Sequence, residues 1–381
     1  MRKAKRLLNR YLRLPFFWFI SVCLFCVLVV SLMQTHVHSS GGHNSLRIFG
    51  RHRSRNVFHA GVAAERKIYL KRIRLQRKLS KLLPTLGNWQ LNKTGIMELK
   101  QQLKDHLELT QFICTKKSCP LGSKYYDTVT MHNRSMTIHK EMLELLPMES
   151  PFKTVGAMFK SCAVVGNGGI LRNSSCGKKI DQSDFVFRSN LQPIQEYVRD
   201  AGSKVNFSTI SQSLLSNFRY PDTYKYILNF TNFNTSKFIS AFDEYKDFIL
   251  WIPNSRYSSN MTFNITQLVR KTTNLQMLLY NVEHSEKIQT FWNLTRKGLS
   301  TGLILTSIGL SLCDEVNLYG FWPFPFDHKG RDLPMHYTED LLWDTYRNFH
   351  DYPSEFILLT KLHRQGVLKL HLDKCFVDSL S

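Results

Sequence analysis

The stretch from Cys162 to Asn190 constrains the fold of this chain more than any other. It opens with Cys162–Val165, four apolar residues that do not alternate with polar ones. Such a run is typical of a strand that is buried on both faces of a sheet. A second apolar run, Phe185–Phe187, predicts another short strand. The stretch therefore predicts two short strands, the first of them central in its sheet.

A glycine-rich turn, Gly166-Asn167-Gly168-Gly169, follows the first of these strands. Glycines permit a tight turn and let a ligand approach the backbone closely. In open α/β sheets, ligands bind at the carboxyl ends of strands, where Asn167 and Asn190 fall, so both are candidate ligand contacts. The spacing is G-x-G-G rather than the G-x-G-x-x-G of a nicotinamide dinucleotide site, and no acidic residue follows at the expected distance. On spacing alone, a dinucleotide site and a purely structural turn both stay open.

Four segments of the chain resemble one known family. Cys162–Asn190 closely resembles the large sialylmotif of the animal sialyltransferases, in the form found in the α2,8 subfamily. Leu299–Phe324 is similar to the small sialylmotif, and His336-Tyr337 to the third motif. His350–Glu355 is similar to the very small motif, His-x4-Glu. All four occur in the family's order, which makes the resemblance far more specific than any one of them.

Further apolar segments predict the rest of the sheet. Phe248–Ile252, Met277–Tyr280 and Val316–Tyr319 have the composition of strands, with helical patterns between them. This alternation predicts an α/β domain with a mostly parallel sheet. The resemblance implies the same architecture: a single Rossmann-like domain related to the GT-A glycosyltransferases, predicted here over residues 86–381.

The N-terminal part of the chain predicts a membrane anchor. From Phe16 to Met33 the sequence is apolar, and about 27 Å of helix is long enough to span a bilayer. A cleaved signal peptide is the alternative, but no clear small-x-small cleavage site follows. The basic tail predicts a type II protein with residues 1–14 cytosolic, a signal-anchor at 15–33 and the remainder luminal. The resemblance implies that the membrane is that of the Golgi apparatus.

Nine Asn-x-Ser/Thr sequons also indicate a glycoprotein of the secretory pathway. None of them lies in the predicted cytosolic tail. Their asparagines are Asn92, Asn133, Asn173, Asn206, Asn229, Asn234, Asn260, Asn264 and Asn293.

Residues 34–85 are predicted to be a basic luminal stem. Gln34–Asn56 is rich in His, Ser, Gly and Arg and has little to bury, which favours disorder. In Arg66–Leu82, aliphatic residues recur at helical spacing among lysines and arginines, which predicts a basic amphipathic helix. The stem fits two roles: a solvated spacer, or a segment attracted to anionic glycans or lipid head groups.

The net charge of +22 belongs mainly to the tail and stem. Residues 1–85 hold 18 lysines and arginines and one acid, whereas the remaining 296 residues hold 33 basic and 28 acidic residues. Basic and acidic residues are nearly equal in number in the globular part, which gives poor support to nucleic-acid binding. No nucleic-acid partner is therefore predicted.

Six cysteines in the predicted luminal part suggest disulfides, because their number is even and the compartment is oxidising. The sequence alone allows fifteen pairings. The resemblance implies a bond from Cys162 to Cys313, which closes a loop of about 150 residues and should stabilise the fold by roughly 4–5 kcal/mol. It also implies a bond from Cys176 to Cys375, which leaves Cys114 and Cys119 as a third pair. A zinc site is the alternative, but no paired C-x-x-C spacing supports it.

A predicted helix, Leu303–Leu312, begins directly after a Ser-Thr-Gly turn. Free backbone amides at a helix start, with two hydroxyls beside them, make an anion site, although an ordinary helix cap fits the same residues. The resemblance implies that the anion is the donor substrate, CMP-sialic acid. The residues implied to bind the donor are Asn167, Asn190, Ser300, Thr301, Gly302 and Trp322.

Two histidines are candidate catalytic residues through the resemblance. His350 corresponds to the family's general base, which takes the proton from the acceptor hydroxyl. His336 corresponds to the histidine that donates a hydrogen bond or proton to the departing phosphate. A histidine pKa of about 6.5 suits proton transfer in a mildly acidic lumen. For Glu355, a structural role and a role through its neighbours both stay open.

The chain departs from the family pattern in two places. Where close relatives have Tyr-His-Tyr-Tyr, this chain has Met335-His336-Tyr337-Thr338, so donor contacts made by the two replaced tyrosines are not expected here. Where the family usually has another cysteine, this chain has Ser189, and the sequence identifies no pairing partner that is lost.

The resemblance implies the reaction. Sialic acid moves from CMP-sialic acid to the 8-hydroxyl of a terminal sialic acid on a glycolipid or glycoprotein, with inversion of configuration. The chain has no Asp-x-Asp, and the family is not metal-dependent, so no metal and no cofactor are predicted. Within the subfamily, the glycine at the third position of the 166–169 turn and the few basic residues in 284–299 resemble the members that add one or a few sialic acids, so the resemblance favours this over polysialylation. A membrane-anchored sialoglycan-binding protein without catalysis and an NAD-type oxidoreductase are the alternatives from other classes.

Overall fold

The computed structural model of this protein describes residues 69–107, 112–126, 135–152, 158–218, 220, 230–245, 248–252, 259–294, 298–338, 343 and 350–375. The chain divides into two compact units, residues 1–75 and 76–381. Residues 69–75 of the first unit are helical, and so are residues 76–82 of the second, which confirms the described part of the helix predicted over Arg66–Leu82. The predicted anchor at 15–33 and most of the predicted stem lie outside the described residues. Within the described ranges, no helix combines the length and the apolar character needed to span a bilayer.

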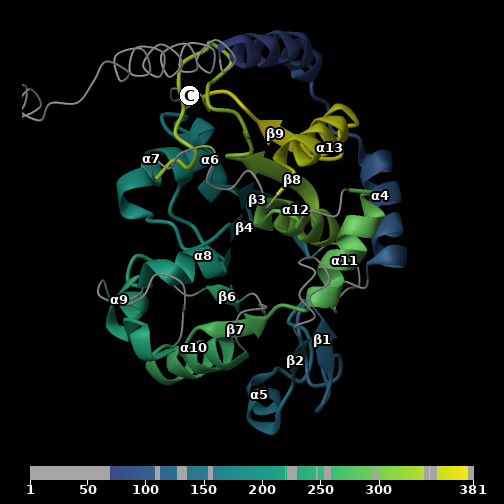
Figure 1. Ribbon diagram of the computed structural model, residues 1–381. Helices are drawn as coiled ribbons and strands as arrows, with labels where there is room; N and C mark the ends of the chain where they lie inside the picture. The colour runs from purple at the N-terminus through teal and green to yellow at the C-terminus, as the bar shows by residue number, and fades with distance from the viewer. Residues whose placement is uncertain are drawn as a thin grey trace, which may run out of the picture. The chain divides into compact units, whose positions relative to one another are not determined.

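The second unit is built on a seven-stranded parallel sheet with helices on both faces (Figure 1). The strand order is β7-β6-β5-β4-β3-β8-β9, and every neighbouring pair is parallel. The prediction of an α/β domain with a mostly parallel sheet is confirmed. The strands are β3 Phe159–Val165, β4 Phe185–Arg188, β5 Phe207–Thr209, β6 Ile249–Ile252, β7 Gln276–Leu279, β8 Cys313–Tyr319 and β9 Lys369–His371.

Burial on both faces explains why the apolar run of β3 does not alternate with polar residues. Ala163 and Val164 are both fully buried. Val164 faces helix α12 (Thr301–Leu312), whose Gly309 lies against it. Ala163 and Val165 face the opposite side, where they form a hydrophobic cluster with residues of helices α6 and α7. Successive side chains of a strand point to opposite faces, so a strand between two helical layers needs apolar residues at every position.

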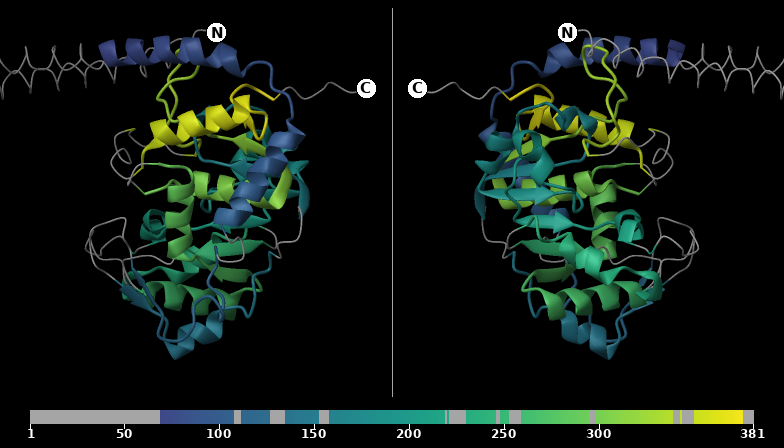
Figure 2. Two further views of the ribbon diagram at one scale, coloured as in Figure 1. Left: turned by 90° about the vertical axis from the view of Figure 1, so that its right-hand side faces the viewer. Right: turned by 90° about the vertical axis from the view of Figure 1, so that its left-hand side faces the viewer.

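Helix α12, Thr301–Leu312, is the apolar helix that the sequence predicted over Leu303–Leu312. All of the residues in 303–312 are buried, because the helix lies between the sheet and helices α4 and α11. Figure 2 shows the blue helix α4 lying against the green helices of this layer. The helices are α4 Lys93–His106, α5 Lys140–Leu145, α6 Gly177–Asp181, α7 Val198–Ala201, α8 Gln212–Leu215, α9 Thr235–Ser240, α10 Ser259–Thr272, α11 Val282–Phe291, α12 and α13 Tyr352–Arg364.

A region far from helix α12 has a core of aromatic side chains. Phe238 of α9 is fully buried, and its ring lies 5.1 Å from those of Phe218, Phe233 and Phe242. Helix α10 packs against α9 and against strand β7. A separate two-stranded antiparallel sheet is formed by β1, Lys124–Tyr126, and β2, Ser135–Thr137.

Three disulfides confirm the implied pairings. Cys162 on β3 is bonded to Cys313, the first residue of β8. Cys176, directly before α6, is bonded to Cys375, and the two cysteines left over, Cys114 and Cys119, are bonded to each other. The first bond therefore joins two neighbouring parallel strands in the interior of the sheet.

The predicted glycosylation sites differ in accessibility. Asn92, Asn173 and Asn293 are exposed, as attachment of a bulky glycan requires. Asn133 and Asn229 lie outside the described residues.

The direction in which strands are added reverses at β3. From β3 the chain adds β4, β5, β6 and β7 in turn on one side, and then returns to place β8 and β9 on the other. In open α/β sheets, such a reversal opens a crevice at the carboxyl ends of the strands, and ligands bind there. The topology therefore places a binding site next to the ends of β3 and β8.

Candidate active site

A pocket lies at this reversal point, and part of its lining comes from residues just after the strands. Gly166–Gly168 follow β3, Ser189 and Asn190 follow β4, Ser211 follows β5, and Gly320–Pro323 follow β8. The starts of helices α12 and α13 form another side of the pocket. The glycine-rich turn is therefore one part of a composite site rather than a site by itself.

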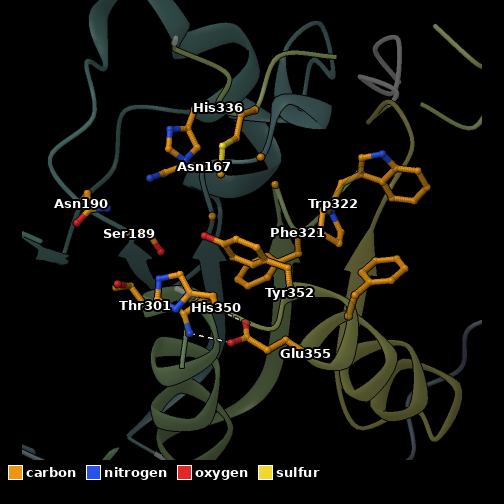
Figure 3. Close-up of a pocket in the computed structure, with 18 of the residues that line it drawn as sticks. Asn167, Ser189, Asn190, Thr301, Phe321, Trp322, His336, His350, Tyr352 and Glu355 are labelled. Carbon is orange, nitrogen blue, oxygen red and sulfur yellow. Dashed lines mark hydrogen bonds between the residues drawn. The ribbon is translucent and has the colours of Figure 1, made fainter. Parts of the chain in front are cut away.

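All eight residues that were predicted to bind the donor or to act in catalysis line this one pocket (Figure 3). They come from four segments that are far apart in the sequence. The eight residues are Asn167, Asn190, Ser300, Thr301, Gly302, Trp322, His336 and His350.

His350 has one ring nitrogen engaged by the backbone. Its Nδ1 lies 2.7 Å from the carbonyl oxygen of Gly298. A carbonyl only accepts hydrogen bonds, so Nδ1 carries the proton and the neutral ring keeps its lone pair on Nε2. Burial lowers the pKa of His350, and the bond to Gly298 opposes that shift in part. The ring is therefore held in the neutral tautomer that a general base requires.

Glu355, in the first turn of α13, holds the start of α12. One of its carboxylate oxygens accepts a 2.7 Å hydrogen bond from the Ser300 amide, and the other accepts the Ser300 hydroxyl. Glu355 is only 6% exposed, and burial raises its pKa to about 7 although the two bonds from Ser300 oppose the shift. His350 and Glu355 thus hold Gly298 and Ser300, two residues apart on one segment. This geometry favours a role for Glu355 through its neighbours.

The sequence left open whether the helix start at Ser300 is an ordinary helix cap or an anion site, and the structure has features of both. The Ser300 side chain is the N-cap of α12, where its oxygen accepts a 3.1 Å hydrogen bond from the Leu303 amide. Its hydroxyl is therefore used within the protein, by Leu303 and Glu355. The amides of Thr301 and Gly302 belong to the first turn, which lacks intrahelical acceptors. These amides and the positive end of the helix dipole favour an anion in the pocket.

The glycines of the 166–169 turn are required by backbone packing. A Cβ on Gly168 would overlap the carbonyl oxygen of Gly320, and a Cβ on Gly169 would overlap that of Pro334. Gly320 itself has a φ of +74°, a left-handed conformation that side chains disfavour. These contacts agree with the interpretation that the glycines serve a structural turn. The same turn also lines the pocket.

His336 reaches the pocket because its segment pairs with the glycine-rich turn. Gly168 and His336 form an antiparallel bridge, and the Tyr337 amide donates a 2.9 Å hydrogen bond to the Asn167 carbonyl. Met335, one of the two positions where the sequence departs from the expected motif, is 6% exposed and lines the pocket. Thr338, at the other departure, does not line the pocket; its hydroxyl donates a 2.6 Å hydrogen bond to the Gln192 side chain.

The Asn190 side chain is oriented by the neighbouring strand. The residue has a φ of +65°, and its side-chain carbonyl accepts a 2.8 Å hydrogen bond from the Ser211 amide. The backbone of Asn190 is held by the side chains of Ser208 and Thr209 on β5. The side-chain carbonyl is therefore occupied, which leaves the NH₂ group as the donor toward a ligand.

Sequence reasoning missed part of the pocket. Phe321 packs so closely on Gly302 that a Cβ there would lie 2.8 Å from its ring, and Ser211 follows β5, a strand that was not predicted. Tyr352 stands beside His350 with ring centroids 5.3 Å apart. Phe321 lies within the small motif, directly before Trp322, so the prediction of Trp322 as a pocket residue could have pointed to Phe321 as well. No local signal marked Ser211, because β5 has only three residues.

Trp322 contributes an apolar wall. It is 3% exposed, its indole N–H donates a 2.8 Å hydrogen bond to the Phe326 carbonyl, and its ring meets Phe324 and Phe356 edge to face. Its polar atom is therefore used inside the protein. Among all the residues that the structure describes, no group of three or more His, Cys, Asp or Glu side chains is arranged to hold a metal ion.

Comparison with known proteins agrees with the motifs. Residues 107–367 match glycosyltransferase family 29 (sialyltransferase). The chain is 34% identical over 299 residues to the alpha-N-acetylneuraminide alpha-2,8-sialyltransferase of Xenopus tropicalis, covering 76% of this chain and 82% of that protein. It is 33% identical over 306 residues to the protein of the same name from Bos taurus, covering 77% and 80%.

Among solved structures, a crystal structure of a mammalian sialyltransferase is similar with a TM-score of 0.48 and 20% sequence identity, covering 72% of this chain and 94% of that one. The family match spans well over half of the chain, and the identity to the two relatives extends across most of both sequences. The chain belongs to glycosyltransferase family 29, the sialyltransferases.

Proposed function

We propose that this sialyltransferase moves sialic acid from CMP-sialic acid to the 8-hydroxyl of a terminal sialic acid on a glycolipid or glycoprotein. The relatives named alpha-2,8-sialyltransferase support the linkage. One observation carries the proposal: a histidine poised as a base and a helix start suited to an anion line the same pocket.

In the proposed reaction, His350 is the base. Its Nε2 takes the proton of the acceptor 8-hydroxyl while that oxygen bonds to the anomeric carbon of the donor. The bond from the anomeric carbon to the phosphate oxygen breaks, and CMP leaves with the electron pair. A single displacement of this kind inverts the configuration. The lowered pKa of His350 keeps the ring neutral and able to accept this proton in a mildly acidic lumen.

Negative charge grows on the phosphate as CMP departs. The start of α12 at Thr301 and Gly302 offers amides and a positive dipole end to that charge, and His336 stands on another wall of the same pocket to donate a hydrogen bond or proton. CMP carries a single phosphate, so amides and an imidazole supply the stabilisation in this mechanism and no metal is required.

The cellular setting is part of the same proposal. The apolar segment at 15–33 anchors the protein in the Golgi membrane, with the domain that contains the pocket in the lumen. Three disulfides in the second unit support an oxidising compartment.

Transfer assays with two acceptors test the proposal. The full-length protein is incubated with CMP-sialic acid and either a glycan that ends in sialic acid or the matched glycan that ends in galactose. We expect transfer only to the sialylated glycan, with an α2,8 linkage in the product. Transfer to galactose alone would contradict the linkage, and sialoglycan binding without CMP release would favour the non-catalytic alternative.

A further inference from the structure

Ser189 stands out among the pocket residues because its buried hydroxyl has no hydrogen-bond partner among the residues that the structure describes. The residue follows β4 directly, is 5% exposed and lines the pocket. Its oxygen is buried and makes no hydrogen bond within the described part of the chain. Figure 3 shows its side chain projecting from the end of β4 between Asn190 and Thr301.

Four nearby hydroxyls are already hydrogen-bonded within the protein. Ser208 donates to the Asn190 carbonyl, Thr209 accepts from the Asn190 amide, and Ser211 accepts from the Leu214 amide. Ser300 is bonded to Glu355 and Leu303. A buried polar group without a partner destabilises a fold, and it calls for an explanation in each structure that has one.

The backbone fixes where the Ser189 side chain begins. Its amide donates a 3.0 Å hydrogen bond to the Val165 carbonyl at the end of β3. Arg188 faces the α6 side, where its Nε donates to the Lys204 carbonyl, so the next residue faces the opposite side, toward the start of α12. A serine side chain has a single heavy-atom torsion with three staggered positions, so the hydroxyl turns toward a ligand in the pocket at low cost.

We infer that the Ser189 hydroxyl forms a hydrogen bond with the CMP part of the donor. The inference rests on the proposed function, because it assumes that CMP-sialic acid occupies this pocket. A hydroxyl both donates and accepts, so it suits a phosphate oxygen and a ribose hydroxyl equally well. Its place between Asn190 and the start of α12 puts it among the residues proposed to hold the nucleotide.

Calorimetric titration of the full-length protein with CMP tests the inference through Ser189→Ala. We expect the dissociation constant to rise about tenfold, which corresponds to ~1.4 kcal/mol at 25 °C. The melting temperature should stay unchanged, because the hydroxyl makes no bond that the variant would break. Ser311→Ala is the matched control: Ser311 is 8% exposed, donates a 3.0 Å hydrogen bond to Ser307 inside α12 and does not line the pocket, so CMP affinity should be retained.

Two further arms make the result decisive. Ser189→Cys keeps the size of the side chain with a weakly bonding thiol, and it should weaken CMP binding even if the alanine variant fails to fold. With cytidine as the probe, an unchanged affinity of the variant places the contact on the phosphate, and an equal loss places it on the nucleoside; both support the inference. Wild-type protein that does not bind CMP overturns the donor assignment itself. Wild-type protein that binds CMP no better than both Ser189 variants overturns the inference alone.

Discussion

Two regions of the same sheet are built on different principles. The pocket region comprises β3, β4, β8, α12 and α13. It buries the Glu355 carboxyl and the Ser189 hydroxyl and partly buries the His350 ring, all of them groups that are unfavourable to remove from water. The distal region comprises β6, β7, α9 and α10, and its core is filled with phenylalanine and aliphatic side chains. The pocket region holds the catalytic candidates, whereas the distal region holds side chains whose only evident role is packing.

This contrast shows how stability and chemistry are divided in the domain. Buried aromatic side chains remove large apolar areas from water, so the distal region contributes stability without constraining the site. The pocket region keeps polar and ionisable groups where burial shifts their pKa values, because proton transfer and anion binding need them there. Substitutions in the two regions should therefore affect different measurements.

Replacement of the base should give the largest effect on turnover. In His350→Ala we expect the transfer rate to fall by about 10²–10⁴-fold, which is the usual contribution of a general base. CMP affinity and melting temperature should stay close to wild type, because the ring makes one backbone hydrogen bond and little packing is lost. Transfer assays and calorimetry measure both quantities. A variant that keeps more than about a tenth of the wild-type rate would remove His350 as the base.

The opposite pattern is expected in the distal region. Phe238→Ala empties a fully buried position and should lower the free energy of unfolding by about 3–5 kcal/mol. The rate per folded molecule should be unchanged, because the residue does not line the pocket. Denaturant unfolding and active-site-normalised turnover provide the readouts. A variant with full stability but a slow rate would break the division between the two regions.

A smaller effect, dependent on pH, is expected at Glu355. The pKa of this carboxyl is raised to about 7 in the folded protein, so between pH 4.5 and 7 the folded state binds a proton that the unfolded state has lost. Stability should therefore fall as the pH rises through that window. In Glu355→Gln this loss is absent, so the free energy of unfolding should exceed that of the wild type at pH 7.5 by on the order of 1–3 kcal/mol, with little difference near pH 4.5. Unfolding curves at both pH values test this, and parallel pH profiles for the two proteins would contradict it.

The smallest effect is expected from chelation. If amides at the start of α12 and His336 stabilise the leaving phosphate, EDTA should leave the transfer rate within experimental error of the untreated enzyme. Addition of Mg²⁺ or Mn²⁺ after dialysis is the control. A rate that collapses with EDTA and returns with either metal would show that the pocket region depends on a metal after all.

The sequence by itself determined most of the strands and which residues belong to the site. Non-alternating apolar runs predicted β3, β4, β6, β7 and β8, because strands covered on both faces need apolar residues throughout. The four motifs named eight residues that the fold brings into one pocket. The resemblance implied two disulfides and left Cys114 and Cys119 as a third pair, and the structure contains all three bonds. These features follow from short stretches of chain and from family motifs.

Only the tertiary structure decided how those residues support one another. The Glu355–Ser300 pair joins positions 55 apart in the sequence, and the packing of Gly168 on Gly320 joins the turns that follow two different strands. The Ser189 hydroxyl finds no hydrogen-bond partner among the described residues, and this too depends on everything packed around it. Contacts of this kind depend on which elements pack together and at what distance, and no local pattern of residues carries that information.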